Sequence, residues 1–201
     1  MSKKLNNLLR YCIISTMCDV LLSYISGNAS MLPLNKEYDA VTNTFRESMG
    51  SENICVSAIY KIINPMLSND FSNRIASITA ARNSVPEVVN VFHGTTLKAA
   101  ANIVNTGFDP AYSTIAAYGK GTYASPSARM AVGYCKDVKK ESDFSMIFRC
   151  RFIKGKHGFA GGNQEIDTNV IDYCGSGDIL VTPYTDGIIP DYLICYYQWD
   201  K

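Results

Sequence analysis

An alternating stretch, FSMIFRCRFI at residues 144–153, constrains the fold more than any other feature of the chain. Apolar side chains recur at every second position, which is the period of a strand with one face on a core. These positions are Met146, Phe148, Cys150 and Phe152. Two more β-rich runs follow, ILVTPY and PDYLICYYQW, and hairpin-length links outnumber helical crossovers in this half of the chain. The sequence therefore predicts an α+β domain with a mostly antiparallel sheet.

The first half of the chain predicts helices and strands in turn. ICVSAIYKI (54–62) and VVNVF (88–92) are rich in residues that favour strands. Helical spacing of apolar residues predicts three helices, at 37–49, 67–83 and 97–107. In the third helix, Thr96 is the expected N-cap and Gly107 the expected end.

Other segments carry weaker patterns. A further helix is expected to open at Ser125 and Pro126 and to continue to Tyr134, which follows Tyr123 by 11 residues, or about three helical turns. Residues 27–35 read as a turn-rich break, and 154–178 hold little regular signal. A loop as long as the second segment usually has a functional reason.

The composition excludes several classes of protein. Hydrophobic residues make up 47% of the 201 residues and charged residues 18%, as in a globular domain. A net charge of +1 gives no electrostatic footprint for nucleic acid or for an anionic membrane. The seven cysteines form no CxxC pair and no Cys/His cluster, so neither a metal site nor a disulfide framework is expected. Reduced thiols indicate the cytoplasm, with the nucleus as the alternative.

The N-terminal segment has two interpretations. A charged start followed by an apolar stretch resembles a signal peptide, but Asp19 lies inside the apolar stretch and opposes membrane insertion. An amphipathic docking helix that ends near Gly27 explains the same residues. We therefore divide the chain into an N-terminal helical extension, 1–30, and a main domain, 31–201.

Three motifs stand in order along the chain: VFHGT (91–95), AYGKGTYAS (117–125) and IPDYLICYY (189–197). Taken singly, His93 could be a structural histidine and the tyrosines could be ordinary core residues. Together the motifs resemble the catalytic domain of the poly(ADP-ribose) polymerase-like ADP-ribosyltransferases, which have the diphtheria-toxin-type fold with a split sheet. The likeness is closest to the branch that transfers single ADP-ribose units. It runs from about Leu34 to the C-terminus and includes KIINPML at 61–67.

The resemblance implies an NAD site around the first motif. His93 would bond the 2′-hydroxyl of the nicotinamide ribose, and Gly94 would offer its backbone to the nicotinamide carboxamide. Thr95 belongs to the same NAD-binding set. Tyr123 and Tyr134 would flank the nicotinamide ring, Tyr134 by stacking.

A donor loop would cover the NAD molecule. The resemblance places this loop at residues 109–118, with Tyr112 and Tyr118 as its walls. The family requires no metal for its reaction.

Two positions depart from the polymerising members of the family. Those members carry a glutamate in the last strand, where Leu193 stands here as in single-unit transferases; a register shifted by two residues would place Asp191 there instead. Leucine cannot accept a hydrogen bond, so chain growth has no evident catalyst. Ala131 stands where most members have a serine that binds the carboxamide.

The expected function is transfer of single ADP-ribose units from NAD to an acceptor protein, with release of nicotinamide and with automodification. A monomer that needs neither nucleic acid nor membrane is expected. Three alternatives stay open: a PARP-like pseudoenzyme that serves as an interaction module, an RNA 2′-phosphotransferase and a toxin-type transferase. Ala131 would mark the pseudoenzyme. An RNA 2′-phosphotransferase needs a basic surface, and a toxin-type transferase needs a carboxylate-rich last motif.

Overall fold

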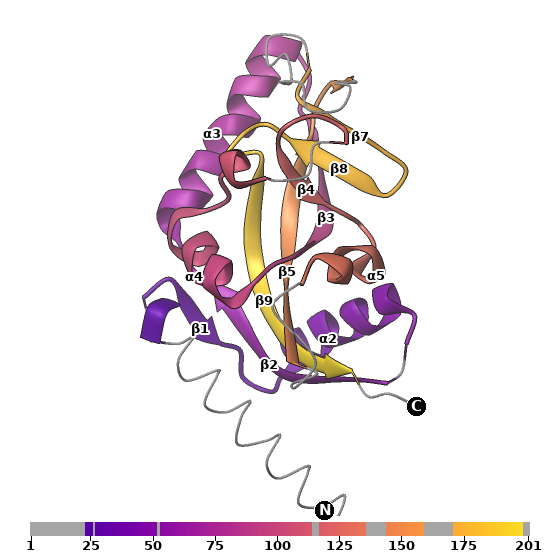
Figure 1. Cartoon of the computed structure of the whole chain (residues 1–201). Helices are drawn as coiled ribbons and strands as arrows, with labels where there is room; N and C mark the ends of the chain where they lie inside the picture. The colour runs from indigo at the N-terminus through magenta and orange to yellow at the C-terminus, as the bar shows by residue number, and fades with distance from the viewer. Residues whose placement is uncertain are drawn as a thin grey trace, which may run out of the picture.

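Two sheets form the centre of the molecule in the computed structural model, which describes residues 23–25, 27–51, 53–113, 117–135, 144–158 and 171–198. The larger sheet has five strands in the order β1-β2-β9-β5-β3, and every neighbouring pair is antiparallel (Figure 1). Its strands are β1 (Ala29–Met31), β2 (Ile54–Ile62), β9 (Ile188–Gln198), β5 (Phe144–Lys154) and β3 (Glu87–Gly94). The predicted α+β class with a mostly antiparallel sheet is confirmed.

The smaller sheet has four strands in the order β4-β8-β7-β6. These are β4 (Thr122–Ala124), β8 (Ile179–Thr182), β7 (Tyr173–Ser176) and β6 (His157–Gly158), and only the β6–β7 pair is parallel. A bridge between Phe92 and Ser125 joins the two sheets through two backbone hydrogen bonds, of 2.6 and 3.0 Å. The core sheet is therefore split, and the split lies beside the first motif.

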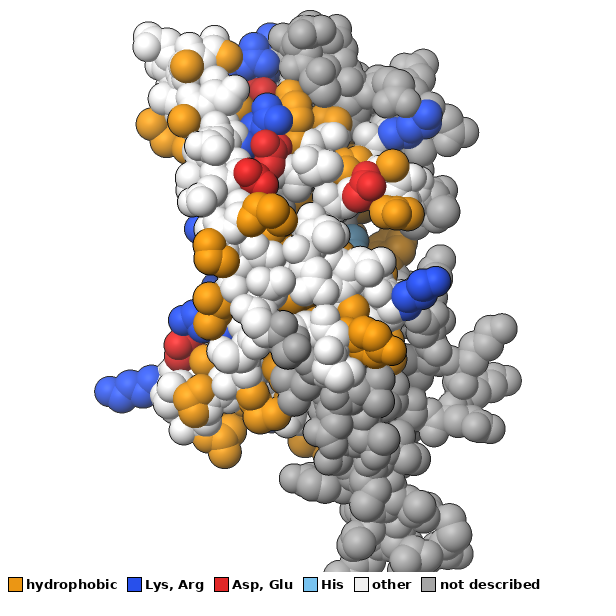
Figure 2. Space-filling view, turned by 90° about the vertical axis from the view of Figure 1, so that its left-hand side faces the viewer, with side chains coloured by type: hydrophobic (Ala, Val, Ile, Leu, Met, Phe, Trp, Pro, Cys, Tyr) orange, Lys and Arg blue, Asp and Glu red, His pale blue; other side chains and the backbone are white. Residues whose placement is uncertain are grey.

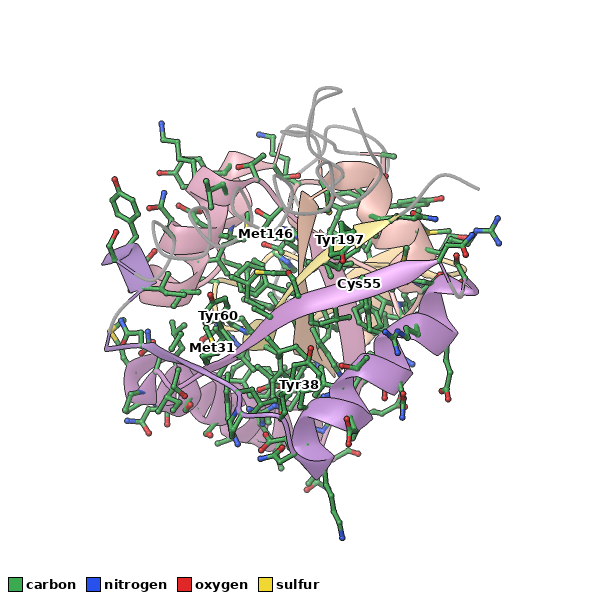
Figure 3. All side chains as sticks on the ribbon, turned by 90° about the horizontal axis from the view of Figure 1, so that it is seen from below. Met31, Tyr38, Cys55, Tyr60, Met146 and Tyr197 are labelled. Atoms are coloured by element: carbon green, nitrogen blue, oxygen red, sulfur yellow. The ribbon has the colours of Figure 1, made fainter. Side chains whose placement is uncertain are left out.

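Helices cover both faces of the larger sheet. The helices α2 (Lys36–Met49) and α3 (Pro65–Arg82) pack on one face, and α4 (Leu97–Thr106) packs on the other. Figure 3 shows the two layers from below, with Tyr38 on the α2 side of the sheet and Tyr60 and Met146 on the α4 side. Each face of the sheet thus has its own hydrophobic cluster.

Helix caps explain where these helices begin and end. Asn35 accepts hydrogen bonds from the backbone of Glu37 and Tyr38 at the start of α2. Thr96 accepts from Ala99 N at 3.2 Å at the start of α4, and Gly107 ends that helix with a φ of 81°. A positive φ of this size favours glycine, because a Cβ atom would strain the backbone. Both predicted caps of α4 are confirmed.

The alternation along β5 is also confirmed, with one addition. Met146, Phe148, Cys150 and Phe152 are all buried, but Ile147 and Ile153 on the opposite face are buried too. The second face is buried because α2 and α3 cover it. A strand covered on both faces no longer needs strict alternation.

The predicted long helix from Ser125 to Tyr134 is wrong. The structure has a single turn, α5 (Ala128–Ala131), with Ser127 at its N-cap, followed by a 3₁₀ turn, η2 (Val132–Tyr134). Ser125 cannot open the helix because its backbone bonds Phe92 in the bridge between the sheets. Val132 and Gly133 are poor helix formers, which explains why the helix does not continue.

Two segments expected to be irregular contain strands. β1 lies inside residues 27–35, and β6 and β7 lie inside 154–178. All three strands are short, and each pairs with a neighbour that the sequence places far away or across a loop. Short strands of this kind are stabilised by tertiary pairing and have too few residues for a pattern.

The predicted N-terminal helix lies outside the described residues, except for residues 23–25, which are helical. In the part of the chain that the structure describes, no helix is long and apolar enough to cross a membrane. Figure 2 shows the face that carries α3 and α4, where basic and acidic side chains are mixed. No large area of one charge covers this face, as the net charge of +1 predicts.

Candidate active site

His93 lies at the end of β3 and is partly exposed. Its Nδ1 atom lies 2.7 Å from the backbone oxygen of Tyr123. A carbonyl oxygen only accepts, so Nδ1 carries the proton and donates it. In the neutral ring, Nε2 then has a free lone pair and can accept a hydrogen bond from a ligand.

The protonation state of His93 favours this role. Burial lowers the pKa of the imidazole below its ordinary value of 6.5, and the hydrogen bond to Tyr123 opposes that shift only in part. The ring is therefore neutral at pH 7. A neutral ring with its proton on Nδ1 is an acceptor at Nε2, the property needed to bind a ribose hydroxyl.

Phe108 fixes the plane of the His93 ring. The two rings form a T-shaped contact, in which the edge of one ring faces the other, with their centroids 4.9 Å apart and their planes at an angle of 74°. Phe108 is buried and packs in turn against Phe148, with centroids 6.1 Å apart. Phe108 lies outside the three motifs, and its position directly after the helix-ending Gly107 is the signal that the sequence offers for it.

Gly94 allows a close approach between β3 and α5. A Cβ atom at Gly94 would collide with the backbone oxygen of Ala131 and would lie 3.0 Å from Sγ of Cys135. Only glycine therefore fits at this position of the first motif. Ala131 is 3% exposed, and the structure brings it beside the glycine whose backbone is expected to bind the carboxamide.

Thr95 and Cys135 support the same junction. Thr95 is buried, and a hydrogen bond joins its backbone to the Cys135 thiol. Cys135 Sγ also donates to the backbone oxygen of Met146 at 3.0 Å. Burial raises the pKa of this thiol to about 11, so it is protonated at neutral pH and acts here as a donor.

Tyr123 closes the turn that precedes it. Its hydroxyl donates to the backbone oxygen of Gly119 at 2.8 Å and accepts from Tyr118 N at 3.0 Å. Burial raises the pKa of this hydroxyl, so it stays protonated. The tyrosine of the second motif thus shapes the loop with its side chain and fixes His93 with its backbone.

The remaining tyrosines differ in exposure. Tyr118 packs beside Tyr123 against the cluster of Ile171, Cys174 and Val181. Tyr134 is 41% exposed and lies near enough to Tyr123 to raise the pKa of its hydroxyl. Tyr112, in the 3₁₀ turn η1 (Pro110–Tyr112), is 82% exposed. The predicted donor loop is described only at residues 109–113 and 117–118, so its course over the site lies outside the described residues.

Leu193 shares a row of the sheet with His93. His93 pairs with Phe148, and Phe148 pairs with Leu193, so the three lie on adjacent strands with their side chains on one face. Leu193 has no exposed surface. Asp191, the alternative residue, instead forms an ion pair of 3.0 Å with Arg151. The third motif position in this row is therefore a core leucine.

Asn64 is a second residue that the sequence analysis did not select. It lies directly before Pro65 and is the N-cap of α3, where it accepts from Leu67 N at 3.3 Å. Its amide group also donates to the backbone oxygens of Val104 and Asn105 at the end of α4, each at 3.1 Å. The Asn-Pro pair predicted a new element but not this link between two helices.

No three His, Cys, Asp or Glu side chains come together as a potential metal site within the described ranges. The groups around His93 are hydrogen-bonding and aromatic: an imidazole, backbone groups of a glycine, and tyrosine rings. Such groups can bind a ribose, an amide and a flat ring.

Comparisons with known proteins show the family of the chain. A family model described as the poly(ADP-ribose) polymerase catalytic domain matches residues 35–156. The human (Homo sapiens) protein mono-ADP-ribosyltransferase PARP14 is 28% identical over an alignment of 180 residues, which covers 83% of this chain and 10% of that protein. The chain thus spans about a tenth of the length of this relative. Since the family model covers more than half of the 201 residues, including His93, Gly94, Tyr123 and Tyr134, the chain belongs to the poly(ADP-ribose) polymerase catalytic domain family.

Proposed function

We propose that this protein transfers single ADP-ribose units from NAD to an acceptor protein and releases nicotinamide. The observation that carries the proposal is the hydrogen bond from His93 Nδ1 to Tyr123 O, which leaves Nε2 as an acceptor at the site of the first two family motifs. Burial lowers the pKa of His93, which keeps Nε2 unprotonated and able to accept a hydrogen bond at neutral pH.

In the proposed binding mode, His93 Nε2 accepts a hydrogen bond from a ribose hydroxyl of NAD. The backbone of Gly94 binds the carboxamide in this mode, on a side other than that of the missing Cβ atom, where the backbone oxygen of Ala131 lies. Tyr134 has enough exposed surface to stack on the nicotinamide ring. Stacking on an aromatic platform contributes about 1–3 kcal/mol for a ring of this kind.

The proposed reaction needs little chemistry from the protein. The bond between the ribose carbon and the nicotinamide nitrogen breaks, and its electron pair leaves with neutral nicotinamide. The acceptor atom bonds that carbon from the opposite face and releases its proton. The protein contributes by holding donor and acceptor in line and by excluding water.

Leu193 supports the transfer of single units rather than chains. Its side chain is apolar and fully buried, so it cannot polarise the hydroxyl of a growing chain. The related human protein is named as a mono-ADP-ribosyltransferase, which favours the same product. Ala131 is the feature that favours the alternative, an inactive PARP-like interaction module, because its methyl group offers no hydroxyl to the carboxamide.

Intact-mass spectrometry of the protein after incubation with NAD tests the proposal. We expect additions that each equal one ADP-ribose group, on the protein itself or on an added acceptor. His93→Asn is the matched control: the asparagine amide can still donate to Tyr123 O but has no atom at the Nε2 position, so transfer should be lost while the fold is kept. Ladders of polymer would contradict the assignment of Leu193, and an unmodified protein that does not bind NAD would favour the interaction module.

A further inference from the structure

We infer that Asn64 and Phe108 are positioning residues for His93: Asn64 fixes the end of α4, and this end holds the Phe108 ring against the imidazole. That this arrangement serves ADP-ribose transfer rests on the proposed function. The arrangement itself can be tested without any activity.

Asn64 uses both ends of its amide to join two helices. It is 7% exposed, and its Oδ1 atom caps α3 by accepting from Leu67 N. Its Nδ2 atom donates to Val104 O and Asn105 O, two carbonyl groups in the last turn of α4 that have no partner within their own helix. One buried side chain therefore sets the start of α3 and the end of α4 relative to each other.

The end of α4 packs directly on the start of α3. A Cβ atom at Gly107 would lie 2.9 Å from Cδ2 of Leu67, so the Leu67 side chain of α3 packs on the backbone at the end of α4. With its φ of 81°, Gly107 turns the chain out of α4, and Phe108 follows at once in the hydrophobic cluster. The position of the Phe108 ring thus depends on the amide of Asn64, which holds the end of α4.

His93 has two fixed contacts that together define its ring. The hydrogen bond to Tyr123 O fixes Nδ1, and the edge contact with Phe108 fixes the plane about that bond. With one contact alone the ring could rotate about the hydrogen bond and turn Nε2 away from a ligand. Both contacts are needed to keep Nε2 directed toward a ligand.

The two histidines of the chain make this arrangement visible by NMR. An aromatic ring shifts the resonances of protons near its edge or face, so the imidazole protons of His93 report the position of Phe108. His157 is an internal reference, because its Nε2 donates to Gly175 O and its ring packs on Tyr173, both in the smaller sheet.

Asn64→Asp separates the two functions of the side chain. An aspartate keeps the oxygen that caps α3 but lacks the amide that donates to α4, and its charge repels the carbonyl groups there. We expect the His93 imidazole resonances to move while those of His157 stay in place. Asn35→Asp is the matched control, since Asn35 caps α2 through the same oxygen without bonding α4.

Phe108→Leu removes the aromatic ring and keeps an apolar side chain. It should move the same His93 resonances, and the double variant Asn64→Asp/Phe108→Leu should move them no further than Phe108→Leu alone. Such non-additivity shows that Asn64 acts through Phe108. In the active enzyme, kcat/KM for NAD should fall by up to about 100-fold in either variant, since a misplacement of about 1 Å can cost that much.

The inference is overturned if Asn64→Asp leaves the His93 resonances at their wild-type positions, or if the two substitutions shift them additively. Should Asn64→Asp fail to fold, Asn64→Ser keeps a neutral cap and gives the same comparison. A protein that shows the expected shifts but transfers no ADP-ribose would refute the proposed function and leave the positioning of His93 intact.

Discussion

At the scale of the residue, His93 combines a fixed proton with a lowered pKa. Because burial favours the neutral ring in the folded state, the unfolded state binds more protons between the lowered pKa and 6.5. The free energy of unfolding should therefore fall as the pH is lowered from about 6.5 to the folded-state pKa, and then level off.

His93→Asn tests this pH dependence. Asparagine does not titrate but can still donate to Tyr123 O, so the contribution of residue 93 to the acid slope should vanish. Urea unfolding at a series of pH values measures the slope for both proteins. If the free energy of unfolding of the variant depended on pH as that of the wild type does, groups other than His93 would cause the dependence.

Ala131 gives a second prediction for a single residue. A serine at this position would add a hydroxyl beside Gly94, and one neutral hydrogen bond to the carboxamide contributes about 0.5–1.5 kcal/mol, or roughly a threefold to tenfold gain in affinity for NAD. Titration with NAD and with a benzamide-type inhibitor measures this gain, which should be equal for both.

The control for that substitution is Ala128→Ser, one turn earlier in α5. Ala128 is also buried, in the same cluster. Its hydroxyl should lower stability as much as that of Ala131→Ser but leave affinity unchanged. Equal dissociation constants for wild type and both variants would mean that position 131 does not face the ligand.

At the scale of the element, the packing of β3 on α5 depends on Gly94. Gly94→Ala would place a methyl group against Ala131 O, and overpacking of this kind costs about 1–3 kcal/mol. Gly133→Ala is the matched control, because a Cβ atom there meets nothing within 4 Å. Thermal unfolding should show a clear loss for the first variant and little change for the second. A loss of equal size in both would contradict the close packing at Gly94.

Elements with their own local signals were predictable from the sequence. β2 and α4 have the predicted extents. β-branched residues recur along β2, and a cap at each end defines α4. α5 was not predictable, because the bridge between Phe92 and Ser125 takes the residue that the pattern assigned to a cap. The strands of the smaller sheet were partly missed because they are too short to show a period, and because β4 pairs with a strand far along the chain.

The same division applies to the candidate site. The motifs predicted His93, Gly94 and Tyr123, and the structure brings the three together. The sequence marks Phe108 only by its place after Gly107 and Asn64 only by its place before Pro65, and neither position predicts a contact with another element. Their importance comes from a ring contact and from hydrogen bonds between helices.

At the scale of the whole molecule, Leu193 belongs to the cluster that joins the larger sheet, α4 and the smaller sheet. Leu193→Glu would bury a carboxylate there without a partner, at a cost of several kcal/mol. We expect this variant to unfold rather than to make polymer, whereas Leu193→Met should fold with a cost below about 1.5 kcal/mol. Circular dichroism and intact-mass spectra test both. A folded Glu variant that extends ADP-ribose chains would show that position 193 faces the ligand after all.

The order of the strands in the larger sheet has a consequence for how the chain folds. β9 lies between β2 and β5, and Ser57 in β2 bonds Cys195 in β9 across 138 residues of sequence. On the ribosome, β2 leaves the exit tunnel long before the strand that it must pair with. Until β9 emerges, β2 carries an unpaired edge that can aggregate. Closing so long a loop is slow. The pairing of β9, which is synthesised after the other strands of this sheet, therefore limits the rate at which the sheet and the site on it form.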